Sequence, residues 1–147
     1  NEPDTIDGVR VVQNSEKIAE ALSNGEIVYH WEAGESMKPL INHMEYCKII
    51  PLSTVLMSCD TVDRGDAVFC KMRTEQGDYY MVHQVWEVAD CGYDRKTWYK
   101  IGSTGTTVFG WSCEILGKAY GTDIYQEVTP EIEAAWQADW EARHPAE

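Results

Sequence analysis

Short apolar runs separated by turn residues fill the middle of this chain, and they constrain its fold more than any other feature. The runs are rich in Val, Ile, Tyr and Trp, which favour strands, and Gly, Asp and Asn stand between them. The candidate strands are 27–31, 46–50, 67–72, 79–88, 97–101 and 115–120. The sequence therefore predicts a mainly β fold.

Helical signals occur only near the two ends of the chain. Apolar residues recur at helical spacing after Ser15, the expected N-cap, and Asn24-Gly25 is the expected stop. Thr129-Pro130 is typical of a helix start, with proline at the first helical position. We expect one domain over 1–147, built of an N-terminal arm and short helix in 1–26, a core over about 27–121 and a C-terminal helix over 129–144.

The C-terminal helix carries an apolar stripe whose partner the sequence does not identify. Ile132, Trp136 and Trp140 fall four apart and therefore share one face. This face either packs on the sheet or forms a partner contact or an oligomer contact through Trp136 and Trp140.

The charge of the chain excludes some classes of partner. Acidic residues number 25 and basic residues 12, giving a formal charge of −13. Such a surface repels phosphate backbones and anionic membranes, so nucleic-acid binding is disfavoured, whereas a basic partner or mimicry of DNA remains open. No apolar run approaches the ~20 residues that cross a bilayer. We expect a cytoplasmic or virion-associated protein.

Cysteine and histidine usage predicts neither a metal nor a cofactor. The five cysteines are widely spaced without a Cys-x-x-Cys pair, which argues against a zinc ribbon and a disulfide framework and for free thiols. Three of the histidines lack ligand spacing, and three aspartates spaced three apart lack the alternation of a calcium loop, so turn formation explains them better. These residues are His30, His43 and His144, and Asp60, Asp63 and Asp66.

Two segments carry residues that could perform chemistry. Ser36 lies in Gly34-Glu35-Ser36-Met37-Lys38-Pro39, and His83 lies in the candidate strand 79–88. A serine hydroxyl becomes a useful nucleophile when a neighbouring base accepts its proton. The turn at Gly34 is expected to leave amides unpaired for an oxyanion, while Met37 and Pro39 serve packing and turn rigidity.

The order of the motifs resembles that of a known superfamily. After the Ser36 box come Arg64-Gly65-Asp66, then Val82-His83-Gln84-Val85, then Tyr99 to Gly102, and finally Leu116 to Gly121. This succession over roughly 27–121 is similar to that of signal peptidases and LexA-type self-cleaving repressors, and several phage and bacterial relatives look similar too. The resemblance implies a signal-peptidase/LexA-like β-ribbon fold of mixed antiparallel sheets, with short helices at each end.

The resemblance also implies roles for individual residues. Ser36 corresponds to the nucleophile and His83 to the general base of the histidine branch, with small side chains at the cleavage point. That branch has an aspartate after the base, where this chain has Gly102-Ser103. Ser103 could hydrogen-bond the imidazole without compensating its charge. Asp66, Asp94 or Asp123 could supply a carboxylate from elsewhere.

The leading hypothesis is thus a serine peptidase that uses Ser36 and His83 to cleave a peptide bond in a polypeptide substrate. The alternative is a catalytically inactive descendant that acts as a phage or bacterial interaction or structural protein. An acidic inhibitor that imitates DNA is a third idea, resting on charge alone. Self-cleavage of the repressor type is disfavoured, because Ala33-Gly34 lies too close to Ser36 to reach its hydroxyl.

Overall fold

A mixed sheet of nine strands organises the chain in the computed structural model, which describes residues 4–91 and 95–143. The order across the sheet is β1-β2-β3-β4-β9-β5-β6-β7-β8. All neighbours pair antiparallel except β2 and β3. The strands are β1 (Thr5–Ile6), β2 (Val9–Val11), β3 (Val28–Trp31), β4 (Glu45–Pro51), β5 (Ala67–Thr74), β6 (Gly77–Cys91), β7 (Lys96–Gly102), β8 (Val108–Ser112) and β9 (Glu114–Tyr125). The expectation of a mainly β fold is confirmed.

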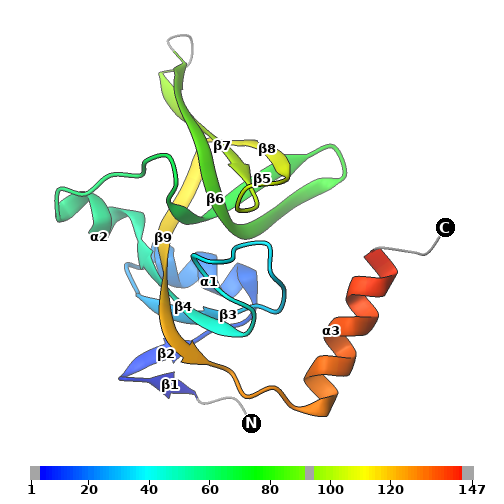
Figure 1. The fold of residues 1–147 in the computed structure, drawn as a ribbon. Helices are drawn as coiled ribbons and strands as arrows, with labels where there is room; N and C mark the ends of the chain where they lie inside the picture. The colour runs from blue at the N-terminus through cyan, green and yellow to red at the C-terminus, as the bar shows by residue number, and fades with distance from the viewer. Residues whose placement is uncertain (1–3, 92–94, 144–147) are drawn as a thin grey trace.

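Strand β9 joins the two halves of the molecule (Figure 1). It pairs with β4 on one side and with β5 on the other, and Ala119 faces Ile49 of β4 and Ala67 of β5 in the two registers. The strands β1 to β4 form one half with α1 (Ser15–Ser23), and β5 to β8 form the other. The strand pairing between the halves therefore runs through the last of the nine strands.

Two hydrophobic cores lie on opposite faces of β5 and β6. Phe69 and Val82 belong to the core beneath α1, together with Ile18 and Ile49. The adjacent Val68 belongs to the second core, as do Val85, Ile101 and Ile115. This alternation follows from the two-residue period of a strand, which sends successive side chains to opposite faces.

The helices agree with the sequence in place and differ in detail. Helix α1 begins at Ser15, but its cap is Asn14, whose side chain accepts a hydrogen bond from the Lys17 amide at 3.0 Å. The predicted Ser15 cap was wrong by one residue. Helix α3 (Pro130–Arg143) starts as expected, and the Ile132 amide donates to Thr129 Oγ1 at 3.2 Å. Among the described residues, no helix combines the length and apolarity that a bilayer crossing needs.

Helix α2 (Leu52–Met57) and strand β8, which forms the outer edge of the sheet, were not predicted. Strands β1 and β2 lie in the segment that was expected to be an arm. The β5–β6 turn is tight, because Thr74 pairs with Gly77 and leaves only residues 75 and 76 between the strands.

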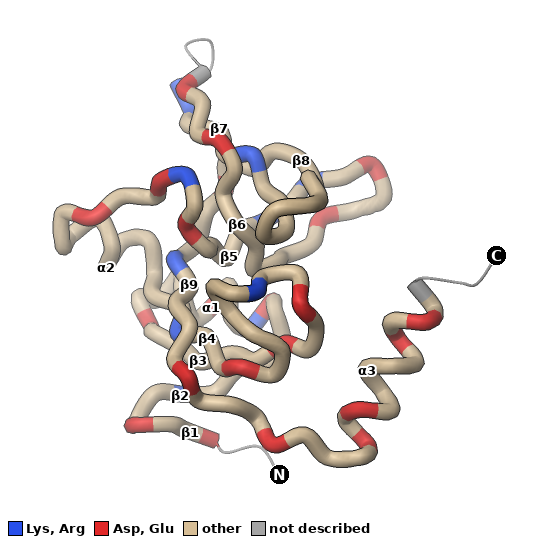
Figure 2. Tube along the Cα trace, in the orientation of Figure 1, with Lys and Arg blue, Asp and Glu red and all other residues tan. Residues whose placement is uncertain are grey.

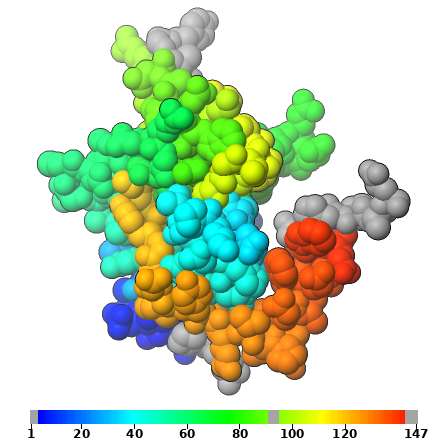
Figure 3. All heavy atoms as spheres, viewed as in Figure 1, coloured from blue at the N-terminus to red at the C-terminus, as the bar shows by residue number. Residues whose placement is uncertain are grey.

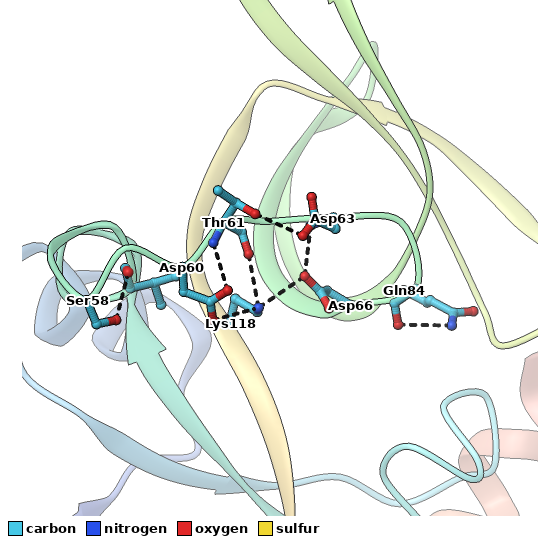
Figure 4. A network of polar contacts seen from close by, with 9 residues as sticks. Ser58, Asp60, Thr61, Asp63, Asp66, Gln84 and Lys118 are labelled. Atoms are coloured by element: carbon cyan, nitrogen blue, oxygen red, sulfur yellow. Dashed lines mark hydrogen bonds and ion pairs between the residues drawn. The ribbon is translucent and has the colours of Figure 1, made fainter.

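A polar network attaches the segment that connects α2 with β5 to strand β9 (Figure 4). The buried Lys118 ammonium lies 3.2 Å from the Asp60 carboxylate and 3.1 Å from that of Asp66, and it donates to the Thr61 carbonyl at 3.0 Å. Asp66 also accepts a hydrogen bond from the Asp63 amide at 2.8 Å. These aspartates thus shape a turn and neutralise a buried cation.

Candidate functional site

Ser36 is an exposed residue on segment 32–44, which connects β3 to β4. Hydrogen bonds and buried side chains fix the conformation of this segment. Gly34 adopts a φ of +114°, which a residue with a side chain rarely adopts, and its amide donates to His43 Nδ1 at 2.7 Å. Met37 and Ile41 insert into the core beneath α1. Burial of these two apolar side chains fixes the turn that presents Ser36 to solvent.

Thr104, in the turn between β7 and β8, ties this segment to the other half of the molecule. Its amide donates to the Ser36 carbonyl at 2.8 Å. Its hydroxyl lies 3.1 Å from the same carbonyl and also contacts the Lys38 carbonyl. The turn where the resemblance led us to look for an aspartate therefore anchors the backbone of Ser36 instead.

The structure brings Ser36 and His83 together. Ser36 Oγ lies 3.3 Å from His83 Nε2, a long hydrogen bond within the range of uncomplexed catalytic pairs. His83 comes from β6, where it pairs with Val68 of β5, so a strand of the second half supplies the imidazole. Phe109 of β8 meets the ring edge-on, with 4.6 Å between centroids. The ring is thus held between the serine and an aromatic wall.

The other imidazole nitrogen has no partner. Nδ1 of His83 is buried and makes no hydrogen bond to any described residue. To accept a proton at Nε2, the neutral ring must carry its hydrogen at Nδ1, and an unsatisfied buried donor costs roughly 1–3 kcal/mol. Within the described residues, no group therefore selects the tautomer that a general base requires.

The residues expected to support His83 lie elsewhere. Ser103 is buried, but its hydroxyl accepts from the Thr107 amide at 3.0 Å and lies 3.0 Å from Thr106 Oγ1. Asp66 is engaged by Lys118 and the Asp63 amide. Because Nδ1 has no partner, neither these two residues nor Asp123 orients it. Asp94 lies outside the described residues.

A carboxylate that the sequence did not single out acts on His83 through its charge. Burial lowers the pKa of His83, and the charge of Glu32 acts in the opposite direction. Burial raises the pKa of Glu32, but the hydrogen bond to His30 together with the charges of His30 and His83 outweighs it, so the pKa lies below its ordinary value. Glu32 Oε1 lies 3.0 Å from His30 Nε2. No motif marks this glutamate, because only the fold shows which carboxylate faces the imidazole.

Replacing Glu32 with glutamine is expected to lower the pKa of His83 further below its usual value. The variant removes the charge that favours the imidazolium and leaves the burial that disfavours it. The measurement is an NMR titration of the His83 ring proton on Cε1. Glu35→Gln, on the same segment, is the matched control and should leave the titration in place, because Glu35 is not among the charges that act on the pKa of His83. An unchanged or raised pKa in Glu32→Gln would contradict the assignment.

A small cavity of about 320 Å³ opens beside the serine. Its polar lining residues are Glu32, Ser36 and Asn42, and its apolar lining residues include Met37, Ile41, Cys47 and Val82. Burial raises the pKa of the Cys47 thiol, which therefore stays protonated. The cavity suits a small apolar group next to the Ser36 hydroxyl.

The turn at Gly34 leaves two amides beside Ser36 without an acceptor among the described residues. The Gly34 amide is occupied by His43, so Gly34 serves only the turn. In the described part of the chain, the amides of Ser36 and Met37 donate to no acceptor. They are the donors that could face a developing oxyanion, while the Met37 side chain is buried as packing.

No three His, Cys, Asp or Glu side chains within residues 4–91 and 95–143 come together as a metal site requires. Comparisons of the chain with models of protein families, with curated proteins and with solved structures found no match. The functional argument therefore depends on the site itself.

Proposed function

We propose that this protein is a serine peptidase with a signal-peptidase/LexA-like β-ribbon fold, in which Ser36 is the nucleophile and His83 the general base. The observation that carries the proposal is the 3.3 Å separation of Ser36 Oγ and His83 Nε2 beside an open, mainly apolar cavity. Ser36 and His83 lie in different halves of the molecule and far apart in the sequence, so the fold, and not their position along the chain, brings them together.

The chemistry follows from the geometry. His83 Nε2 accepts the Ser36 proton as Oγ bonds to the carbonyl carbon of the substrate, and the carbonyl electrons move to oxygen. The Ser36 and Met37 amides stabilise that oxyanion. As the carbonyl re-forms, the C–N bond breaks and His83 returns its proton to the amine. Water then hydrolyses the acyl-enzyme by the same steps, and the Glu32 charge stabilises the imidazolium in both.

The adjoining cavity supports a preference for a small apolar side chain next to the scissile bond. Its volume of about 320 Å³ includes the opening to solvent, so the closed part is smaller than the site of a drug-sized ligand. This agrees with the small residues that the resemblance implies at the cleavage point.

A second candidate function is a non-catalytic interaction module of the same fold. The observation that favours it is the unpartnered Nδ1 of His83, because a catalytic triad fills this position with a carboxylate. Losing that carboxylate in the chymotrypsin template lowers turnover by roughly ten-thousand-fold. Slow chemistry is therefore expected even if the peptidase assignment is right.

A fluorophosphonate probe separates the two functions, because it labels an activated serine irrespective of substrate. We expect labelling of the wild type at Ser36, identified by peptide mass spectrometry, and none in Ser36→Ala. Ser53→Ala removes an exposed serine of α2 and should label like the wild type. A wild type that remains unlabelled over many hours would favour the non-catalytic module.

A further inference from the structure

Helix α3 lies next to the segment that carries Ser36. Contacts of the chain just before the helix, and one contact of the helix itself, hold it there. At its base, the Gln126 amide donates to the Met44 carbonyl at 2.8 Å, and Tyr46 donates its hydroxyl proton to Gln126 Oε1. Along the helix, Trp136 packs on His43 with 4.9 Å between ring centroids. Figure 3 shows the orange-red helix beside the cyan surface of this segment. The helix thus forms a wall next to the serine.

A trough runs along this wall and reaches the nucleophile. One cavity, of about 1080 Å³, is lined by Ser36, Glu35 and Gly34 on one side and by Trp136, Gln137 and Trp140 on the other. A second, of about 1070 Å³, continues past Trp136 toward Trp31, Glu32 and Asp139. The two share Ala33 and Trp136. The two cavities therefore form one continuous open trough between α3 and the segment that carries Ser36.

The charge of the trough is negative. Glu32, Glu35 and Asp139 line it, and no described Lys or Arg side chain does so. Figure 2 shows the acidic positions on α3 and on the facing segment. Trp140 is 42% exposed, so part of its side chain is open to contact with a bound peptide. A second copy of this chain is a poor occupant, because each copy has a formal charge of −13.

We propose that the trough between α3 and the segment 32–36 binds an extended, Lys- or Arg-containing polypeptide and feeds it to Ser36. The carboxylates select the cationic side chains, Trp136 and Trp140 contact their aliphatic stems, and the small cavity beside Ser36 receives an apolar residue. Naming this ligand as substrate rests on the proposed function, but the binding itself does not require hydrolysis.

The test measures binding by fluorescence anisotropy with the full chain carrying Ser36→Ala, so that no turnover interferes. The probes are two fluorescein-labelled octapeptides, one of alternating Lys and Ala and one of alternating Glu and Ala. We expect the Lys peptide to bind at least about ten-fold more tightly than the Glu peptide, with affinity that falls as NaCl rises. Equal binding of the two peptides, or binding of neither, would overturn the proposal.

Matched charge reversals locate the binding. Glu35→Lys and Glu87→Lys change the net charge equally, but only Glu35 lines the trough, whereas Glu87 pairs with Lys100 on β6 and β7. We expect Glu35→Lys to weaken Lys-peptide binding by roughly five-fold or more and Glu87→Lys by less than about two-fold. Equal losses would show attraction to net charge alone and sink the assignment.

Two further outcomes are decisive. Trp140→Ser, a change at an exposed position, should weaken the Lys peptide without altering the fold. Self-association that Trp140→Ser abolishes, without peptide binding, would assign the face to a second copy and overturn the proposal. If the Lys peptide binds but the wild type neither cleaves it nor takes up a fluorophosphonate, the trough stands and the peptidase assignment falls. If the wild type cleaves peptides without preferring Lys over Glu, the peptidase assignment stands and the trough proposal falls.

Discussion

Ser36→Ala and His83→Ala are each expected to lower peptide hydrolysis at least about a thousand-fold, and the double variant is expected to lose no more than either single one. A nucleophile and its base act as one unit, because either residue alone leaves the proton-transfer step undone. The 3.3 Å contact between Oγ and Nε2 is the physical basis of this non-additivity. The measurement is kcat/KM on a quenched peptide with Lys on one side of an Ala-Ala bond.

The same experiment has an internal control in Cys47, whose thiol lines the cavity beside Ser36. Because that thiol is buried and stays protonated, Cys47→Ala should retain the activity that depends on Ser36 and His83. If the loss of kcat/KM in the double variant equals the product of the two single losses, the two side chains contribute independently. Such a result would remove the general-base role of His83.

Replacing Glu45 with alanine is expected to destabilise the fold by roughly 3–5 kcal/mol. Glu45 is only 3% exposed, and its carboxylate accepts hydrogen bonds from the Asn42 amide at 2.8 Å and the Asp123 amide at 2.9 Å. It also accepts from the Asn42 side chain at 3.1 Å. Alanine would leave these donors without an acceptor and open a void. Urea unfolding followed by tryptophan fluorescence measures the loss.

The matched control for this change is Glu87→Ala, which removes an exposed carboxylate 3.4 Å from Lys100. Exposed pairs contribute little, so we expect a change of no more than about 0.5 kcal/mol. Glu45→Gln should lose an intermediate amount of stability. The oxygen of the new side-chain amide still accepts a hydrogen bond, but its NH2 group faces a backbone N–H donor. Equal stability of Glu45→Ala and Glu87→Ala would show that the Glu45 hydrogen bonds contribute nothing net.

Local residue patterns were enough to predict most strands, whereas the pairing of Ser36 with His83 was expected from the resemblance of the motif order to a known superfamily. Apolar runs in 67–72 and 79–88 marked two partners of a hairpin, and the Thr129-Pro130 pair marked the start of α3. These signals are local, since they follow from the conformational preferences of a few adjacent residues. The motif order then indicated which serine and which histidine would meet.

The remaining features depend on contacts that no local pattern encodes. Glu32 influences His83 because the fold places it at the same cavity as Ser36, and the Thr104 turn holds the Ser36 backbone from a position 68 residues later. The hydrogen bond from the Gly34 amide to His43, nine residues on, could likewise not be read from the sequence. Strand β8 was missed because glycine interrupts it at position 110.

The site also has a consequence for biosynthesis, through the pairing of β9 with both β4 and β5. A growing chain has made both Ser36 and His83 before it reaches β9, yet it lacks the strand through which the two halves of the sheet pair. We therefore expect the hydroxyl and the imidazole to reach their observed separation only after β9 has been made.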